Sequence, residues 1–271
     1  MRIDQLLVQR QLASTRSQAQ RLIAGGVEWL QGEAWRRAVK NGDEIPDDAP
    51  VRLIDDSEAR YVSRGGLKLE AALNQVGLSV TGLQCLDVGQ STGGFTDCLL
   101  QRGAAYVVGV DVGSAQLHPS LRADPRVLCL EKINARVLDA ADLTAAYALT
   151  EISATNPNPD FVPEFDLIVA DLSFISQTLV LPAVVPLLQA GGTLLTLVKP
   201  QFELQPGQVG KGGIVKNASM YLLVERRLRE TCAALGLTVT AWFDSPITGG
   251  DGNREFFICS TKACTLEKDL S

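Results

Sequence analysis

Histidine and paired cysteines are scarce in this chain, and each scarcity excludes a class of site. His118 is the only histidine among 271 residues, which argues against a histidine-based catalytic triad or a zinc centre. The six cysteines form no Cys-x-x-Cys pair, and most stand inside apolar segments. This arrangement favours reduced core thiols over disulfides or a metal site, so no metal is expected.

Long uninterrupted apolar runs are also missing. The longest apolar region, from Leu167 to Val198, is broken by charged, amide, proline and glycine residues. It therefore lacks the pattern of a transmembrane helix. The first residues carry no apolar segment, so no signal peptide is expected. These absences predict a cytoplasmic protein without stable membrane insertion.

Basic residues are fewer than acidic ones, which gives a net charge of −6, but the basic residues are unevenly distributed along the chain. Residues 1–40 carry seven basic and three acidic side chains, whereas residues 41–60 carry two basic and seven acidic ones. The chain thus begins with a net charge of +4, followed by −5. A basic patch of this kind favours a nucleic-acid partner, which the total charge alone argues against.

The basic patch falls on two expected helices. Apolar spacing predicts one helix around 3–10 and a second from Thr15 to Gly25-Gly26. Short strands are expected afterwards around 27–30, Val39, Ile45 and 51–54. Three arginines lie outside the apolar stripes of the helices and are predicted to contact nucleic-acid phosphates: Arg2, Arg16 and Arg21. An ordinary solvated helix face is the alternative.

The rest of the chain is organised around the stretch from Cys85 to Asp97. An apolar run ends there in Asp87, and a turn rich in glycine and hydroxyl groups leads into helical spacing. Glycines allow a ligand to approach the backbone, and free N–H groups at a helix start hold negative charge. The pattern Asp-x-Gly-x-Ser-x-Gly differs from the dinucleotide pattern Gly-x-Gly-x-x-Gly, so NAD is not predicted. A turn kept for packing alone is the alternative.

Later strands extend this pattern into a sheet. Six more are predicted, at 106–110, 127–130, 167–170, 193–198, 239–243 and 255–260, with the last two forming an antiparallel pair. Alternation with helices indicates an α/β doubly wound sheet, whose ligands lie at the carboxyl ends of the strands. Asp111 ends the second strand, where an acid commonly holds ribose hydroxyls. Asp171 and Lys199 follow later strands at the same edge.

Taken together, these motifs resemble known families. Residues 2–7, 14–19 and 41–45 resemble the S4 RNA-binding domain. The whole ordered set resembles the TlyA family, whose members join an S4 domain to an FtsJ-like ribosomal RNA methyltransferase domain and are also named hemolysin A. The segments that carry this likeness are 61–69, 86–97, 110–113, 171–176, 197–203, 210–213, 245–249 and 253–256.

The resemblance implies a domain division, a fold and an activity. An S4-like RNA-binding domain of the α+β class, with its linker, would span 1–60, and the methyltransferase domain 61–271. The latter would be a Rossmann-like α/β fold with a seven-stranded sheet. S-adenosylmethionine would be the cofactor and ribosomal RNA or a ribosomal subunit the partner, with methylation at the ribose 2′-oxygen. A membrane-active hemolysin and an RNA-binding protein without catalysis are the alternatives.

The resemblance also implies the site residues. Lys199 would act as general base, Lys68 and Asp171 would position it, and Glu255 would hold the network. Cofactor contacts would come from Gly89, Ser91, Gly93, Asp111 and Asn134. Two features depart from the family pattern. Gln90 stands where alanine is usual and is expected to crowd or hydrogen-bond the cofactor, and the loop at 150–163 is long and has no functional account.

Overall fold

A computed structural model describes residues 1–13, 15–54, 59–148, 162–249 and 252–264. Contacts between Cα atoms divide the chain into two compact units, Met1–Leu67 and Lys68–Ser271. Residues 55–58 of the expected linker and 150–161 of the expected long loop lie outside the described residues.

The first unit packs two helices on a small sheet. Helix α1 spans Ile3–Gln9 and helix α2 spans Arg16–Gly26. Thr15 caps α2 by accepting the Gln18 backbone N–H at 3.2 Å, which is the arrangement expected of a threonine before a helix. Apolar side chains from both helices and the first strand form the core: Ile3, Leu6, Leu7, Ala19, Leu22, Ile23 and Val27.

Three antiparallel strands make this small sheet, in the order β2-β1-β3. They are β1 (Val27–Gln31), β2 (Ala34–Arg37) and β3 (Val51–Leu53). Gln31 pairs with Ala34, and Gly32 adopts a φ of +63°, which gives a two-residue hairpin. The second strand therefore lies before Val39, and the prediction of strand structure at Val39 is wrong. The strand instead follows directly after the turn at Gly32, in a segment with too few apolar residues to indicate it.

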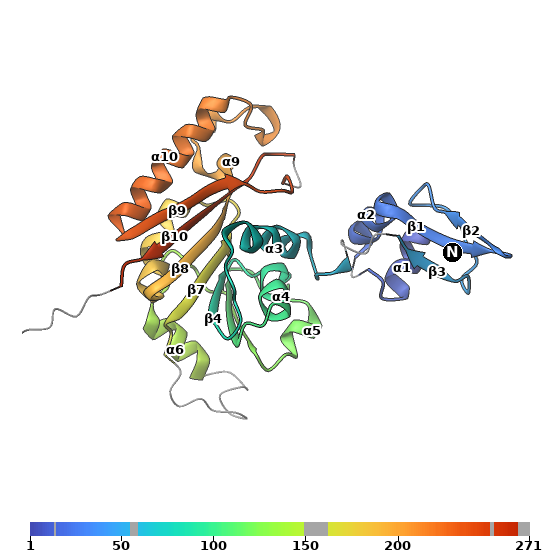
Figure 1. Ribbon diagram of the computed structural model, residues 1–271, viewed down its shortest axis with the longest axis horizontal. Coiled ribbons are helices and arrows are strands. Elements are labelled where there is room, and N and C mark those ends of the chain that lie inside the picture. The colour runs from blue at the N-terminus through green and yellow to red at the C-terminus, as the bar shows by residue number, and fades with distance from the viewer. Residues whose placement is uncertain (14, 55–58, 149–161, 250–251, 265–271) are drawn as a thin grey trace, which may run out of the picture. The chain divides into compact units, whose positions relative to one another are not determined.

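The second unit contains a seven-stranded sheet in the order β6-β5-β4-β7-β8-β10-β9 (Figure 1). The first five of these strands run parallel, and β10 pairs antiparallel with both β8 and β9. The predicted α/β sheet and its antiparallel last pair are confirmed. The strands are β4 (Gln84–Val88), β5 (Tyr106–Asp111), β6 (Val127–Glu131), β7 (Phe165–Asp171), β8 (Leu188–Val198), β9 (Leu237–Asp244) and β10 (Phe256–Lys262).

Helices cover both faces of this sheet (Figure 1). One face carries α3 (Arg64–Val76), α4 (Gly94–Gln101) and α5 (Pro119–Arg122). The other carries α6 (Ala140–Ala148), α8 (Leu181–Val184) and α10 (Ala218–Ala234), and the short helix α9 (Pro200–Glu203) follows β8. Single 3₁₀ turns lie at Gln177–Leu179, Val185–Leu187, Pro206–Gln208 and Lys211–Gly213.

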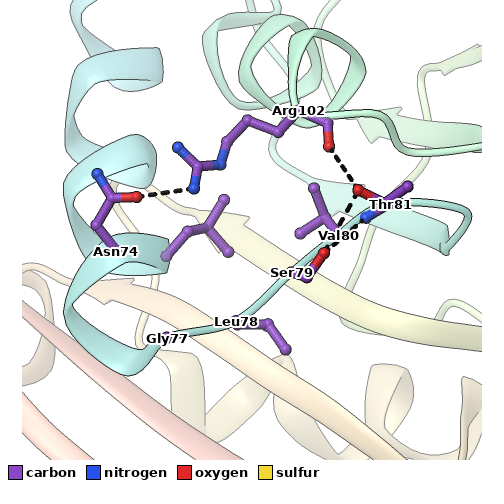
Figure 2. A pocket seen from close by; sticks show the side chains of 8 residues that line it. Asn74, Gly77, Leu78, Ser79, Val80, Thr81 and Arg102 are labelled. Carbon is purple, nitrogen blue, oxygen red and sulfur yellow. Dashed lines mark hydrogen bonds between the residues drawn. The ribbon is translucent and has the colours of Figure 1, made fainter.

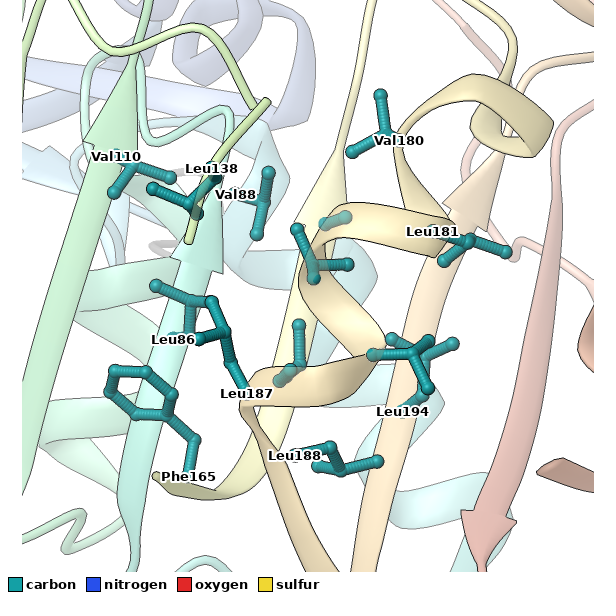
Figure 3. Packing of buried hydrophobic residues seen from close by; sticks show 14 of the residues in the cluster. Leu86, Val88, Val110, Leu138, Phe165, Val180, Leu181, Leu187, Leu188 and Leu194 are labelled. Carbon is teal, nitrogen blue, oxygen red and sulfur yellow. The ribbon is translucent and has the colours of Figure 1, made fainter. Parts of the chain in front are cut away.

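Alternate strand residues supply the largest core cluster (Figure 3). Leu86 and Val88 of β4 point into it beside Val110 of β5, and Leu181 joins it from α8. Each such side chain contributes about 1.5–3 kcal/mol when fully removed from water. This packing fixes the strand ends, and with them the groups that follow each strand.

The cysteines and the helices settle two further expectations. All six cysteines lie in the described residues and are free, and four of them are buried. The four buried thiols lie in the core, as their apolar sequence context predicts. Across the described ranges, no helix combines the length and the hydrophobicity needed to cross a bilayer.

Candidate active site

The loop between β4 and α4 bends closely around its neighbours. Gly89 has a φ of +85°, and a Cβ atom there would lie 2.7 Å from the backbone oxygen of Asp171. Gly93 has a φ of +94° at the N-cap of α4, where a Cβ atom would lie 2.4 Å from a methyl group of Leu121. Both positions require glycine, because the backbone conformation and the space each exclude a side chain.

A cavity of about 470 Å³ opens beside this loop. Its lining comes from the carboxyl ends of β4, β5 and β7 and from the segment after β6. Four of the five predicted cofactor residues line it: Gly89, Ser91, Asp111 and Asn134. Gly93 lies outside the lining and instead allows α4 to start close to α5.

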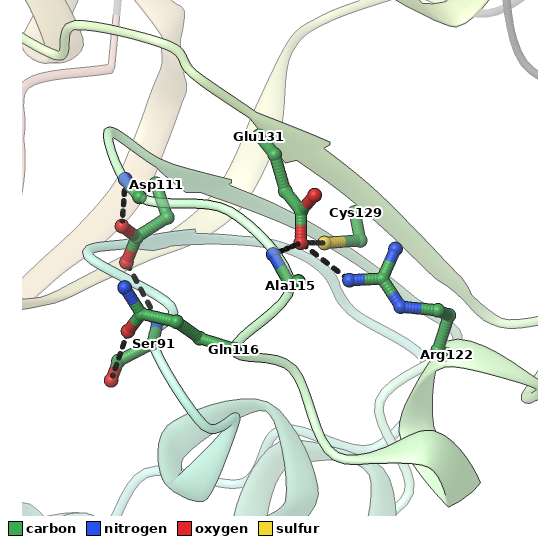
Figure 4. Close-up of polar contacts among 8 residues, drawn as sticks. Ser91, Asp111, Ala115, Gln116, Arg122, Cys129 and Glu131 are labelled. Carbon is green, nitrogen blue, oxygen red and sulfur yellow. Dashed lines mark hydrogen bonds and ion pairs between the residues drawn. The ribbon is translucent and has the colours of Figure 1, made fainter.

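Asp111 connects two loops at the cavity (Figure 4). Its carboxylate accepts the backbone N–H of Ser91 at 2.7 Å and that of Gly113 at 2.7 Å. The Ser91 hydroxyl donates to Oε1 of Gln116 at 3.2 Å. A carboxylate offers about four acceptor sites, so Asp111 retains acceptor capacity toward the cavity. Gln116 was not predicted from the sequence, where its only signal is its place in the loop after β5.

A second polar cluster holds the same loop from the other side (Figure 4). The Glu131 carboxylate accepts the backbone N–H of Ala115 at 2.8 Å and also pairs with Arg122. The hydrogen bond from Arg122 holds the pKa of Glu131 below its usual value. Ala115 has a φ of +57°, a conformation that costs free energy in a non-glycine residue. Glu131 therefore stabilises the loop that contains Gln116.

Gln90 points into the protein, away from the cavity lining. Its side chain is 4% exposed and fills the space above Gly109, where a Cβ atom would lie 2.0 Å from it. Its Nε2 donates to Thr96 Oγ1 at 2.9 Å, and that hydroxyl donates to Asp87 Oδ2 at 2.7 Å. The expectation that Gln90 crowds the cofactor is therefore wrong, because Gly109 gives the longer side chain room inside the fold.

Asp87 itself lies buried below the glycine loop, with 1% exposure. Burial raises its pKa to about 7, and the negative charges of Asp171 and Asp111 act in the same direction, against the hydrogen bond from Thr96. Removing a carboxylate from water disfavours its charged form. Asp87 is thus a buried carboxylic acid with a pKa near neutral pH.

Lys68 and Glu255 form a buried ion pair. The Lys68 amine lies 2.5 Å from Glu255 Oε2, and the two residues are 8% and 3% exposed. Lys68 stands in the second turn of α3, which starts at Arg64, so it lies deeper in the helix than the sequence indicated. Glu255 directly precedes β10, and Phe256 pairs with Val198 of β8. Because β10 runs antiparallel to β8, its first residue reaches the edge where β8 ends.

Lys199 and Asp171 form a second ion pair at that edge. The Lys199 amine lies 2.5 Å from Asp171 Oδ1 and donates to the hydroxyl of Ser173 at 3.0 Å. Pro200 ends the strand directly after Lys199 and starts α9. Ser173 was not predicted as a site residue, although it lies only two positions after Asp171.

The two ion pairs share one electrostatic environment. Burial raises the pKa of Glu255, while Lys68 and then Lys199 lower it, and the charge of Asp171 raises it. The charges of the other three predicted catalytic residues therefore all act on the Glu255 carboxyl group. Asp171 also lines the cavity, so the Lys199–Asp171 pair adjoins it.

A buried polar clamp holds the segment after β7 against the end of β8. Glu203 of α9 is 3% exposed and accepts the Ser176 hydroxyl at 2.5 Å and the Gln177 backbone N–H at 2.8 Å. The Gln177 side chain donates to the Leu197 carbonyl at 2.8 Å and accepts the Thr196 hydroxyl at 2.7 Å. The contacts to Leu197 and Glu203 lie on either side of Lys199 in the sequence. Their partners, Ser176 and Gln177, follow shortly after Asp171.

Phe174 lies in the segment between Asp171 and this clamp. Its side chain is 90% exposed and lines the cavity, and its φ is +64°. Its ring centroid lies 4.9 Å from that of Phe202. A large apolar ring held in water beside a cavity is a candidate contact for an incoming flat group.

The predicted RNA-contacting residues lie in the first unit. Arg2 and Arg16 both donate to the carboxylate of Asp4, with nitrogen–oxygen distances of 3.0 and 2.9 Å at Oδ2. Asp4 has no exposed side-chain surface, and the hydrogen bond from Arg2 holds its pKa well below its usual range. The two arginines remain 44% and 55% exposed, whereas Arg21 is half-buried. Asp4, which was not predicted from the sequence, gathers two of the three arginines at one point.

Another cavity of about 470 Å³ lies at the carboxyl end of α3 (Figure 2). Arg102 donates to the Asn74 side chain at 2.7 Å, and Thr81 donates to the Arg102 carbonyl at 3.4 Å. No predicted site residue lines this cavity, and its one charged group, Arg102, is already engaged. In the residues that the structure describes, no three His, Cys, Asp or Glu side chains gather as metal ligands.

Comparison with known proteins gives two family matches. Residues 61–262 match the FtsJ-like methyltransferase family, and residues 1–26 match the S4 domain. A proposed rRNA methyltransferase of Bacillus subtilis is 43% identical over 257 residues, which cover 95% of this chain and 84% of the relative. The 16S/23S rRNA (cytidine-2′-O)-methyltransferase TlyA of Mycobacterium tuberculosis is 42% identical over 261 residues, with 95% and 88% covered.

A solved structure also resembles this chain over most of its length. A proposed hemolysin from Streptococcus thermophilus superposes with a TM-score of 0.69 at 39% identity, covering 97% of this chain and 88% of that one. The domain matches, the relatives and the seven-stranded sheet agree with one another. The chain therefore belongs to the TlyA family of S-adenosylmethionine-dependent methyltransferases, in which an S4 domain precedes an FtsJ-like methyltransferase domain.

Proposed function

We propose that this chain methylates the ribose 2′-oxygen of a cytidine in ribosomal RNA. The observation that carries the proposal is a pair of neighbouring lysine–carboxylate ion pairs, Lys68–Glu255 and Lys199–Asp171, of which Asp171 also lines the cavity at the carboxyl edge of the sheet. The cytidine and the ribosomal RNA are carried over from the name of the Mycobacterium tuberculosis relative. Residues 1–60 would bind RNA, residues 61–271 would catalyse, and a cytoplasmic ribosomal subunit or its RNA would be the partner.

The cavity fits S-adenosylmethionine. Gly89 lines its wall, and Asp111 keeps acceptor capacity for ribose hydroxyls after binding two N–H groups. Ser91, Gln116 and Asn134 add polar groups to the lining. When bound, the cofactor supplies a methyl group on a positively charged sulfur.

The Lys199 amine would take the proton of the attacking 2′-hydroxyl. A ribose hydroxyl is a weak nucleophile, and a base within hydrogen-bond reach raises its reactivity. Asp171 and Ser173 fix the position of the Lys199 amine, and Lys68 with Glu255 places a second charged pair next to it. Alignment of the reacting atoms contributes a further large share of the acceleration.

Phe174 and the basic helices would hold the RNA. A methyltransferase acting inside a folded RNA needs the target nucleotide drawn out of its stack, and an exposed aromatic ring stabilises such a nucleotide by stacking. Phe174 offers that ring at the cavity. Arg2, Arg16 and Arg21 would bind phosphates in the first unit.

The test is to identify the product. Purified protein is incubated with tritium-labelled S-adenosylmethionine and with ribosomal subunits or free ribosomal RNA, and the labelled nucleoside is identified by mass spectrometry. A 2′-O-methyl group blocks alkaline cleavage of the following bond, so the site is mapped by resistance to alkali. We expect one or a few methylated cytidines. Label on a nucleobase, or none in either substrate, contradicts the proposal.

A further inference from the structure

The small sheet of the first unit has a solvent face that the proposed function does not use. The strand register places Glu28, Leu30, Trp35, Arg37 and Arg52 on this face, because directly paired residues point to the same side of a sheet. The opposite face carries core residues, including Val27 and Trp29. The S4 match ends at residue 26, so the sheet lies beyond the region that this match assigns.

Trp35 and Arg52 are held together on this face. The Arg52 guanidinium carbon lies 4.2 Å from the centroid of a Trp35 ring. Arg52 also donates to Glu28 Oε2, with distances of 2.8 Å from Nε and 2.6 Å from Nη2. Its side chain is still 53% exposed. The ion pair therefore fixes the guanidinium plane beside the indole without removing it from solvent.

The indole is exposed in a strongly basic segment. Trp35 is 38% exposed on a strand whose four residues are all exposed to solvent. Residues 34–40 contain Arg36, Arg37 and Lys40 and no acidic residue. A large aromatic side chain on an edge strand, flanked by arginines, contributes little to the core of the unit. The same combination is typical of surfaces that bind unpaired nucleotides.

We propose that this face binds an unpaired stretch of RNA, with one base stacked on Trp35 and neighbouring phosphates at Arg37 and Arg52. The proposal deepens the RNA substrate class of the proposed function and rests on it. An unpaired strand fits better than a duplex, because paired and stacked bases offer no ring face to an indole. Arginine complements phosphate in charge and geometry.

Two other uses of this face predict different results. If Trp35 and Arg52 only stabilise the sheet, Trp35→Ala lowers thermal stability and leaves RNA affinity unchanged. If the face binds an acidic protein segment, a polyglutamate peptide competes with RNA, and affinity depends on the arginines without depending on Trp35.

The full chain is tested by fluorescence anisotropy with a labelled oligouridylate of about twelve nucleotides and with an RNA duplex of the same length. Trp35→Ala is expected to weaken single-strand binding about 5- to 100-fold, as the loss of one stacked base does. Trp35→Phe is expected to retain most of the affinity. Arg37→Ala is expected to reduce the slope of log affinity against log salt by about 0.7. Arg126→Ala removes an exposed, ion-paired arginine just before β6 and is the matched control.

Equal single-strand affinity of Trp35→Ala and wild type overturns the proposal, as does a wild type that binds the duplex as tightly as the single strand. A loss of affinity in Arg126→Ala equal to that in Arg37→Ala also overturns it, because the effect is then general charge. Circular dichroism and S-adenosylmethionine affinity check that each variant is folded. Methyl transfer to ribosomal RNA is measured on the same preparations. If the protein methylates ribosomal RNA but its RNA affinity does not depend on Trp35, only the proposed binding surface is rejected. If the RNA affinity depends on Trp35 but no methyl group is transferred, only the proposed function is rejected.

Discussion

Lys199 is held by two oxygen atoms, the Asp171 carboxylate at 2.5 Å and the Ser173 hydroxyl at 3.0 Å. A carboxylate alone fixes the distance between an amine and one acceptor but allows the amine to rotate around that acceptor. A second acceptor also fixes the orientation of the amine. The Lys199 amine is thus held at a defined position by the protein itself.

The first prediction concerns the Lys199 amine. Lys199→Ala should lower kcat about 10²–10⁴-fold, as the loss of a general base does, with S-adenosylmethionine affinity nearly unchanged. Lys199→Arg should fail as well, because a guanidinium does not release its proton near neutral pH. Calorimetry gives the affinity and tritium transfer gives the rate. A fully active Lys199→Arg enzyme would falsify the assignment of Lys199 as base.

The second prediction concerns Asp111. Asp111→Ala should weaken S-adenosylmethionine binding by about 1–3 kcal/mol, because it removes an acceptor and releases the Ser91 and Gly113 N–H groups. Asp124→Ala, which breaks an exposed ion pair with Arg126, is the matched control. Calorimetric titration measures both variants. Unchanged affinity of Asp111→Ala would remove this residue from the cofactor site.

The third prediction concerns the buried acid Asp87. Its pKa is raised from 3.8 to about 7 by burial, so the folded state holds this proton more tightly than the unfolded chain. Its contribution to stability is therefore complete below about pH 4 and is lost as the pH rises through about 7. Asp87→Asn should lose less stability than the wild type between about pH 5 and pH 8. Urea unfolding at both pH values checks this, and parallel losses in the two proteins would contradict it.

Among the elements, the segment after β7 and the short helix α9 depend on each other. Glu203, Gln177 and Ser176 join them through buried hydrogen bonds, and the Phe174 and Phe202 rings add an aromatic contact. Burial raises the pKa of Glu203, and the hydrogen bonds from Gln177 and Ser176 oppose that shift. Three of the groups that join the two elements, Ser176, Gln177 and Glu203, thus act on the positions of Asp171 and Lys199 without lining the cavity.

The fourth prediction tests this clamp. Glu203→Gln replaces one buried acceptor with a donor, so it should lower the free energy of unfolding by about 1–3 kcal/mol. It should lower kcat more than it changes S-adenosylmethionine affinity, because the clamp positions Lys199 relative to Asp171. Glu225→Gln, on an exposed face of α10 beside Arg229, should stay within about 0.5 kcal/mol of wild type. A Glu203→Gln enzyme with full kcat argues against a positioning role.

The elements of the large sheet were predictable from sequence because strands buried on both faces read as apolar runs. Strand β2 was not, since Trp35, Arg36 and Arg37 show no apolar alternation and the strand pairs with β1 alone in its sheet. Loop structure was harder still. Gln90 was expected at the cofactor, and only the packing of Gly109 shows where its side chain goes.

The candidate site likewise contains residues that the sequence predicts and residues that only the tertiary structure reveals. Gly89, Ser91 and Asp111 follow from strand ends and local spacing, so the sequence alone places them at one edge. Lys68 and Glu255 are 187 residues apart, and no local pattern relates them. The family resemblance placed both residues in one catalytic set, and the structure adds that they form an ion pair. Ser173, Gln177 and Glu203 interact through tertiary contacts and had no separate signal.

For the whole molecule, the fifth prediction separates RNA binding from catalysis. Replacing Arg2 and Arg16 with alanine should weaken binding to ribosomal RNA and reduce the salt slope by roughly 0.7–0.9 for each phosphate that is no longer bound. The affinity for S-adenosylmethionine should not change, because both arginines belong to the first unit. Filter binding at several salt concentrations measures the slope. An unaltered slope in the double variant would move the RNA-binding surface elsewhere.

The position of β10 makes the large sheet depend on the strand that is synthesised after all the others that the structure describes. The strand is the last in the described part of the chain, yet it lies between β8 and β9, so β9 has no neighbour in the sheet until β10 has been made. Glu255 arrives with the same strand and completes a pair whose lysine was translated 187 residues earlier. A chain that stops short of residue 255 would therefore lack the partner of Lys68. It would also lack the strand that joins β9 to β8. Until β10 has been synthesised, the chain can therefore form neither the Lys68–Glu255 pair nor the full strand order of the large sheet.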